Sequence, residues 1–191
     1  MILLHICCGP CTIYPLKVLR QKGFEVKGFF FNPNIHPYRE FRARLRAVEE
    51  FAEIEHLEVI YEKHYGLREY MKSITPYYEY PRRCEACYYL RLSQTAKLAK
   101  ELGAEAFTTT ILYSPYQLHQ LVKEIGEGLA QTYGVPFYYE DFRVSFKEGQ
   151  DEAVKLGLYR QSYCGCIFSE EERYYKKRRK EVARKRRALP W

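Results

Sequence analysis

Several segments that define common protein classes are missing from this 191-residue sequence. It contains no G-x-G-x-x-G loop and no P-loop lysine, so the phosphate cradles of many nucleotide-binding sheets are absent. No apolar run approaches the roughly 20 residues that cross a bilayer, and we therefore expect no membrane partner. The first residues, Met1-Ile2-Leu3-Leu4, carry no basic n-region, so no export is predicted and the expected location is cytoplasmic.

An even cysteine count is also missing, which excludes a complete disulfide framework because seven cysteines leave one thiol over. A cytosolic protein keeps its thiols reduced. The cysteines fall in three tight groups separated by long cysteine-free stretches, a spacing that core packing does not require. Clustered thiols of this kind indicate metal binding or redox chemistry. The groups are Cys7, Cys8 and Cys11; Cys84 and Cys87; and Cys164 and Cys166.

The formal net charge of +7 is confined to the C-terminal end of the chain. Ten of the 31 basic residues lie between Arg173 and Arg187, where Glu181 is the one acid, and the remaining body is close to neutral. Such a run predicts either a solvated terminal helix or an arm that binds RNA, DNA or an anionic membrane. A membrane is the weakest of these partners because the segment has little apolar face.

Strand and helix patterns alternate along the chain. Strands are predicted at residues 2–6, 26–31, 57–61, 107–112 and 135–142. Helices are predicted from Thr12 to Gly23, over 38–54, over 84–102, from Ser114 to Tyr133, and in the basic tail from a capping box at Ser169. This alternation predicts an α/β fold: a Rossmann-like parallel sheet with helices on both faces, followed by a basic C-terminal helix. We expect one α/β catalytic domain at residues 1–168 and a basic helix or tail at 169–191.

The predicted fold places chemically useful side chains at one edge of the sheet. Cys7, Cys8 and Cys11 follow the first strand directly, and ligands of such sheets gather outside the carboxyl ends of the strands. A helix N-terminus lowers the pKa of a nearby thiol, so Cys8, Cys11 and Cys84 are placed to ligate a metal or to react. Asp141 ends the fifth predicted strand, where its carboxylate could donate a proton, bind a metal or pair with Arg143.

The residues leave several kinds of thiol chemistry open. Soft thiolates favour iron–sulfur clusters, zinc and copper(I), and adjacent cysteines are easier to place on a cluster than on one zinc ion. The Cys164-Gly165-Cys166 spacing permits a reducible disulfide or a second metal site. A structural-zinc RNA-binding module remains an alternative. So does a thioredoxin-like oxidoreductase using Cys8-Gly9-Pro10-Cys11, although the other cysteines argue against it. His5 and His36 have no partner at ligand spacing and are expected in core or loop roles.

Six motifs follow one another in the order of a known family. They are His5-x-Cys7-Cys8-Gly9-Pro10-Cys11, Phe31-Asn32-Pro33-Asn34-Ile35-x-Pro37, Cys84-x-x-Cys87-Tyr88-x-Leu90-Arg91-Leu92, Thr108-Thr109-Thr110, Ser114-Pro115-Tyr116-Gln117, and Tyr159-Arg160-Gln161-x-Tyr163-Cys164-Gly165-Cys166-Ile167-x-Ser169. Together they resemble the QueH-type epoxyqueuosine reductases over nearly the whole chain. The basic tail is the part that this resemblance covers least.

The resemblance implies a fold related to the adenine-nucleotide α-hydrolases (HUP-type). It also implies the last step of queuosine synthesis, the cobalamin-independent reduction of the epoxide of epoxyqueuosine in a tRNA anticodon loop, with an unidentified electron donor. It further implies a [4Fe-4S] cluster on Cys7, Cys8, Cys84 and Cys87 and a redox-active pair, Cys164 and Cys166. Cys11 is then left over and is expected to help hold an additional mononuclear iron.

The substrate implied by the resemblance adds roles for other residues. Asp141 or Tyr163 is expected to protonate the epoxide oxygen. Tyrosines that could stack on loop bases are Tyr77, Tyr78, Tyr80, Tyr88 and Tyr89, although packing is expected for most of them. The residues expected to hold tRNA phosphates are Lys176, Lys177, Arg178, Arg179, Lys180, Arg184, Lys185, Arg186 and Arg187.

Overall fold

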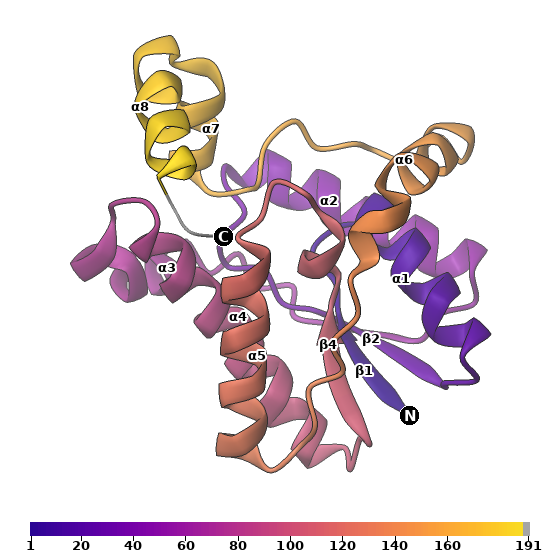
Figure 1. Cartoon of the computed structure of the whole chain (residues 1–191). Helices are drawn as coiled ribbons and strands as arrows, with labels where there is room; N and C mark the ends of the chain where they lie inside the picture. Colours follow the sequence, from indigo (N-terminus) through magenta and orange to yellow (C-terminus); the bar gives the residue numbers. More distant parts are fainter. Residues whose placement is uncertain (189–191) are drawn as a thin grey trace.

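A four-stranded, all-parallel sheet organises the chain (Figure 1). The computed structural model describes residues 1–188. The strands lie in the order β3-β2-β1-β4, so the sheet grows in opposite directions from β1 and a crevice is expected between β1 and β4. Their bounds are β1 Ile2–His5, β2 Val26–Phe30, β3 Val59–Tyr61 and β4 Ala106–Thr109.

The side chains of β1 enter two separate cores, because successive residues of a strand point to opposite faces. Leu3 packs with residues of α4 and α5, whereas Ile2 and Leu4 pack with residues of α1 and α2. Helices therefore cover both faces of the sheet, and the predicted α/β architecture is confirmed. The chain's kinship to the adenine-nucleotide α-hydrolases stays a prediction.

The helices match the sequence best where apolar periodicity is strongest. The helix predicted over 38–54 is observed with those bounds, and its apolar stripe is fully buried. The α-helices are α1 Gly9–Gln21, α2 Tyr38–Ile54, α3 Leu67–Ile74, α4 Arg82–Glu101, α5 His119–Tyr133, α6 Phe146–Lys155, α7 Ile167–Tyr174 and α8 Lys176–Arg187. Three 3₁₀ turns lie at Thr75–Tyr77 (η1), Thr110–Tyr113 (η2) and Phe142–Ser145 (η3).

The predicted fifth strand at 135–142 is wrong. Among the described residues, this segment makes one isolated bridge to the sheet, between Phe107 and Phe137, and then enters η3. Pro136 lacks an N–H and could not donate to a ladder. The fourth strand also ends earlier than predicted, because the Thr109 side chain accepts a hydrogen bond from the Ile111 amide and caps η2.

Other helix boundaries were mispredicted for local reasons. Two helices, α3 and α6, were missed, and α5 begins at His119 because Ser114 instead accepts a hydrogen bond from the Tyr116 amide in a turn. The tail contains two helices rather than one, because extended backbone at Tyr175 separates α7 from α8. The first of them is capped by Cys166 instead of opening at Ser169, so the predicted 168/169 boundary falls inside α7.

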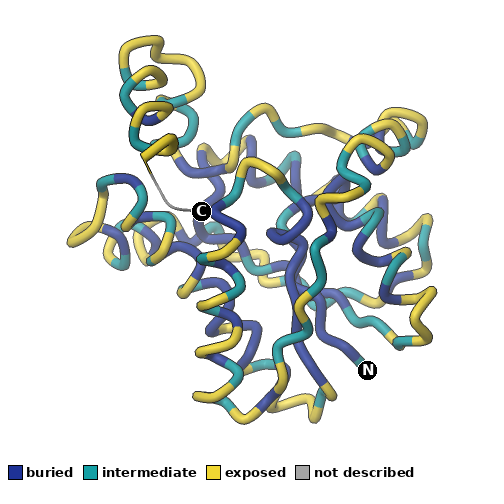
Figure 2. Tube along the Cα trace, viewed as in Figure 1, coloured by how far each residue is buried: buried dark blue, intermediate teal, exposed yellow. Residues whose placement is uncertain are grey.

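The sheet and the tail differ in how far their residues are buried (Figure 2). The strands β1 and β4 are completely buried, whereas α7 contains no buried residue and α8 contains one, Val182. Within residues 1–188, no helix is both long enough and apolar enough to cross a bilayer. The segments that follow β1 and β4 therefore lie where loops meet the buried centre of the sheet.

Candidate active site

A cavity of about 510 Å³ lies at the carboxyl ends of β1 and β4. Segments from both strand ends, from the 160–164 loop and from the α7–α8 hairpin form its wall. Its walls carry thiols, guanidinium groups, amides and three aromatic rings, a mixture that suits a large polar ligand. The lining includes Cys7, Cys11, Arg44, Thr110, Tyr116, Gln117, Phe146, Arg160, Gln161, Tyr163, Cys164, Glu172, Arg173, Arg179, Val182, Ala183 and Arg186.

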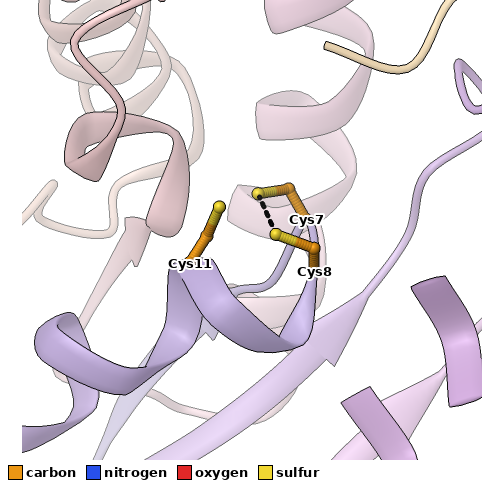
Figure 3. A group of neighbouring side chains, drawn as sticks. All are labelled: Cys7, Cys8 and Cys11. Atoms are coloured by element: carbon orange, nitrogen blue, oxygen red, sulfur yellow. Dashed lines mark hydrogen bonds between the residues drawn. The ribbon is translucent and has the colours of Figure 1, made fainter. Parts of the chain in front are cut away.

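The first cysteine group forms a compact cluster of sulfurs (Figure 3). The sulfurs of Cys7, Cys8 and Cys11 all lie within 4.8 Å of one another, and those of Cys7 and Cys8 are 3.8 Å apart. Cys8 is the N-cap of α1, which turns Cys11 back towards Cys7. Gly9 permits this close packing, because a Cβ atom there would overlap the carbonyl oxygen of Ala47 on α2.

Hydrogen bonds and burial shift the pKa values of the three thiols of this group in different directions. Hydrogen bonds from Cys11 and Cys8, and another from Thr110, hold the pKa of Cys7 well below its usual value despite burial. Burial raises the pKa of Cys8, and the hydrogen bonds to Cys7 and Cys8 raise that of Cys11. The helix N-terminus was expected to lower the pKa of both Cys8 and Cys11, and this is wrong because these effects outweigh it.

The other four cysteines lie near one another but come from one helix and one loop. Cys84 and Cys87 occupy the first two turns of α4, while Cys164 and Cys166 lie just before α7. Burial, followed by the charges of the other members, raises the pKa of Cys84, and burial raises that of Cys87 to about 12. Cys87 and Cys166 also share one apolar cluster with Tyr70. The expected lowering of the Cys84 pKa is therefore also wrong.

Cys164 is the member of this second group that reaches the cavity. Its residue surface is accessible through the cavity, although protein surrounds the thiol closely enough that burial raises its pKa. Cys84, Cys87 and Cys166 do not line the cavity. The predicted Cys164–Cys166 pair is thus asymmetric, with one accessible thiol and one buried thiol.

Two glutamines hold the thiols in place, and the sequence analysis assigned neither a role. The Gln161 amide donates to the sulfurs of Cys8, at 2.9 Å, and Cys11, at 3.3 Å. The Gln117 amide donates to the Cys164 sulfur at 3.4 Å, and its carbonyl accepts a hydrogen bond from Tyr88 at 2.8 Å. Both glutamines lie inside the motifs that resemble the known family. Their place in those motifs was the signal in the sequence that could have indicated a role.

A buried arginine fixes the loop that carries Cys164. Arg44, on α2, donates to Glu40 at 2.7 Å and to the carbonyls of Cys164 and Tyr163 at 2.8 and 2.9 Å. Both charged side chains are at most 9% exposed. Burial opposes the charge of Arg44, but the charges of Cys8 and Glu40 outweigh that effect and raise its pKa. The one sign of this pair in the sequence is the i, i+4 spacing of Glu40 and Arg44.

The candidate proton donors are not equally placed. Asp141 does not line the cavity; Arg143 donates to both its oxygens, at 2.8 and 2.6 Å, and lowers its pKa to about 2. Its position favours the salt-bridge alternative. Tyr163 does line the cavity, and burial together with the Glu40 charge raises its pKa to about 12. Its hydroxyl donates to the His36 carbonyl.

The two lone histidines occupy buried structural positions. His5 contacts the Thr109 hydroxyl at 2.9 Å and the Phe31 carbonyl at 3.2 Å, and burial lowers its pKa to about 3. His36 contacts the Pro33 carbonyl at 3.0 Å. Both positions match the expected core and loop roles.

None of the five tyrosines proposed for base stacking lines the cavity. Tyr80 and Tyr88 are buried, and Tyr77, Tyr78 and Tyr89 are exposed elsewhere. Tyr116 belongs to one of the motifs that resemble the known family, but no stacking role was predicted for it. It lines the cavity, is 66% exposed, and meets the Phe146 ring edge-to-face with centroids 5.8 Å apart.

The donor chemistry of the two cysteine groups fits a soft metal or an iron–sulfur cluster. All seven thiols are free, and no disulfide forms among the described residues. The first group offers three sulfurs within 4.8 Å of one another. The thiols of the second group lie near enough for their charges to raise one another's pKa, but among the described residues no three of their sulfurs come within 4.8 Å of one another. Four thiolates are the usual ligand set of a cubane cluster.

Comparison with known proteins agrees with the motifs. Residues 2–172 match the family model described as epoxyqueuosine reductase QueH. Curated proteins of that name include one from Dehalococcoides mccartyi, 39% identical over 175 residues that span 92% of this chain and 95% of the relative. Another, from Thermotoga maritima, is 36% identical over 193 residues and covers 97% of each chain. Because the match extends over nearly the whole chain and includes all three cysteine groups, the chain belongs to the epoxyqueuosine reductase QueH family.

Proposed function

We propose that this chain reduces the epoxide of epoxyqueuosine in tRNA to the alkene of queuosine. Both C–O bonds of the epoxide break, a carbon–carbon double bond forms, and the oxygen leaves as water after gaining two protons and two electrons. The electrons come from an external donor. The observation that carries the proposal is that thiols from separate segments, Cys7, Cys11 and Cys164, open into one arginine-lined cavity.

We propose that Cys7, Cys8, Cys84 and Cys87 hold a [4Fe-4S] cluster, that Cys11 helps to hold a further iron, and that Cys164 and Cys166 are redox-active. When bound, the cluster would supply single electrons and the iron a Lewis acid. The donor types support this assignment. The grouping of Cys84 and Cys87 with Cys164 and Cys166 supplies a sharp test of it, because the competing ligand set replaces Cys7 and Cys8 with those two residues.

The chain's own side chains would orient the substrate and the thiols. Gln161 and Gln117 fix the sulfurs by hydrogen bonds, and Arg44 holds the loop that presents Cys164. The exposed Tyr116 ring offers a stacking surface for an unpaired base. Tyr163 retains its proton at neutral pH and is the proposed donor to the epoxide oxygen; its position supports this role better than that of Asp141.

The basic tail would hold tRNA phosphates. Seven of its nine proposed contact residues are exposed and make no ion pair within residues 1–188, which leaves their charges available to a polyanion. These are Lys176, Lys177, Arg179, Lys180, Arg184, Arg186 and Arg187.

The activity is tested by incubating the anaerobically prepared protein with epoxyqueuosine-containing tRNA and a chemical reductant, followed by mass spectrometry of the released nucleosides. Loss of one oxygen atom from the modified nucleoside supports the proposal. Zinc without sulfide and no product would favour a structural-zinc tRNA-binding module. Disulfide exchange that needs only Cys8 and Cys11 and no metal would favour a thioredoxin-like oxidoreductase.

Iron and sulfide content of two serine variants then separates the ligand sets. The proposed set predicts that Cys8→Ser loses the cluster and Cys166→Ser retains it. The opposite result would move the cluster to the cysteines of the second group.

A further inference from the structure

The helix α8 presents three different faces, and each meets a different environment. Arg179, Val182, Ala183 and Arg186 line the cavity at the i, i+3, i+4 and i+7 spacing of one helical face. A second face carries Arg178 and Lys185, which pair with Glu79 at 3.1 and 3.0 Å. A third face, at i, i+3, i+7 and i+10 spacing, is exposed and makes no ion pair among the described residues; it comprises Lys177, Lys180, Arg184 and Arg187.

Among the described residues, carboxylates neutralise the charges of the second face alone. Arg178 and Lys185 on the second face both pair with Glu79, which attaches the hairpin to the body, and both also pair with Glu181 of α8 itself. Arg83, which is 1% exposed, adds a buried ion pair to Glu172 and lies 5.5 Å from the Tyr80 and Phe168 ring centroids. The hairpin is therefore docked on the start of α4 and on the segment just before it, which carries Glu79 and Tyr80, with its first face turned into the cavity.

The cavity has a large excess of positive charge beside the hairpin. Arg160, Arg173, Arg179 and Arg186 line it without an ion pair to any carboxylate within residues 1–188. Glu172 is the one acid among the described lining residues, and Arg83 already binds it. Arg186 also lies 5.4 Å from the Tyr80 ring, which holds its guanidinium beside the cavity. Guanidinium groups bind phosphate oxygens in a fixed, bidentate geometry.

We propose that Arg179 and Arg186, with Arg160 and Arg173, form a phosphodiester subsite inside the cavity for the backbone next to the reacting nucleotide. The exposed face of α8 binds phosphates farther along the tRNA and takes no part in that subsite. The inference rests on the proposed function for the identity of the nucleotide, but the phosphate subsite itself does not depend on the epoxide. The tail is therefore part of the substrate cavity as well as a general polyanion-binding arm.

The test compares two variants that remove the same two charges from one helix. Arg179→Gln/Arg186→Gln changes the cavity face, and Arg184→Gln/Arg187→Gln changes the exposed face. The probes are two RNA trinucleotides, with epoxyqueuosine or guanosine in the centre, and the full-length tRNA. Binding is measured at fixed salt by titration calorimetry or fluorescence. Arg179→Gln alone is included because the Arg179 side chain makes no hydrogen bond, ion pair or cation–π contact with the described residues.

The cavity-face variant is expected to bind both trinucleotides at least about tenfold more weakly, the effect of losing one charge-assisted hydrogen bond or more. The exposed-face variant should bind them as the unchanged protein does, yet bind full-length tRNA more weakly with a shallower salt dependence. Equal losses for the two variants on the trinucleotides, or no loss for either, would overturn the subsite. Loss with the guanosine trinucleotide in a protein that never reduces the epoxide would uphold the subsite and refute the proposed function.

Discussion

The thiol-bearing edge of the sheet and the α7–α8 hairpin meet at the same cavity but are built in opposite ways. At the sheet edge, functional side chains are buried and fixed by directed hydrogen bonds, such as those from Gln161 to Cys8 and Cys11. In the hairpin, most side chains are exposed and the contacts to the body are mainly ionic. The difference suits the two tasks proposed for these regions, since thiol chemistry needs fixed geometry whereas polyanion binding needs available charge.

The largest effect is expected where a buried charge at the sheet edge loses its partner. Arg44→Met would leave Glu40 buried without its cation and release the loop that carries Cys164. A loss of about 3–5 kcal/mol in the free energy of unfolding is expected for breaking such a pair. Denaturant unfolding measures this loss. Arg44→Met/Glu40→Gln is the control and should recover part of the stability but not the loop position. A loss below about 1 kcal/mol in the single variant would contradict this account.

A smaller and local effect is expected in the hairpin. Arg83→Met removes the buried partner of Glu172, so α7 and α8 should detach while the sheet stays folded. Hydrogen exchange should quicken in residues 167–187 and remain unchanged in β1 and β4. Glu79→Gln is the matched control on the exposed side of the same interface, where pairs contribute up to about 1 kcal/mol. Faster exchange throughout the sheet of Arg83→Met would show that hairpin and body are one cooperative unit.

The smallest effect is expected at Asp141, which belongs to neither region. Arg143 lowers its folded-state pKa to about 2, so its contribution to stability is present above its unfolded pKa and is lost as the pH falls towards 2. Because the pair is more than one-third exposed, Asp141→Asn should cost at most about 1 kcal/mol at neutral pH and should not alter epoxide reduction. A marked fall in turnover with intact iron content would restore Asp141 as a proton donor.

The two regions also differ in how far the sequence could predict them. Strand alternation placed Cys7, Cys8 and Cys11 after β1, and this followed from a buried apolar run next to the cysteines. Long-range partners such as Arg44 with the Cys164 carbonyl join residues 120 positions apart, and no local pattern encodes such a contact. The basic run was evident in the sequence. Its division into three faces could be recognised only from the structure, where α8 begins after the break at Tyr175 and is docked on Glu79.

Prediction of thiol pKa values failed for a related reason. The helix N-terminus is visible in the sequence, but burial and neighbouring sulfurs are not, and these raise the pKa of Cys8, Cys11 and Cys84. The five tyrosines proposed for stacking do not line the cavity, whereas the turn before α5 places the exposed ring of Tyr116 there. Local pattern thus predicts elements well and side-chain surroundings poorly.

The most direct test is a single-turnover experiment with enzyme in excess over epoxyqueuosine-containing tRNA, read by mass spectrometry of the nucleosides. It compares two variants of the cavity lining: Cys164→Ser, which removes a thiol, and Arg179→Gln/Arg186→Gln, which removes two guanidinium groups of α8. We predict that the arginine variant forms queuosine once its concentration exceeds its weakened Kd, and that the cysteine variant forms none at any concentration. Queuosine formation by Cys164→Ser at the unchanged rate would contradict the account, in which the cavity thiols carry the chemistry and the arginines of α8 bind the substrate.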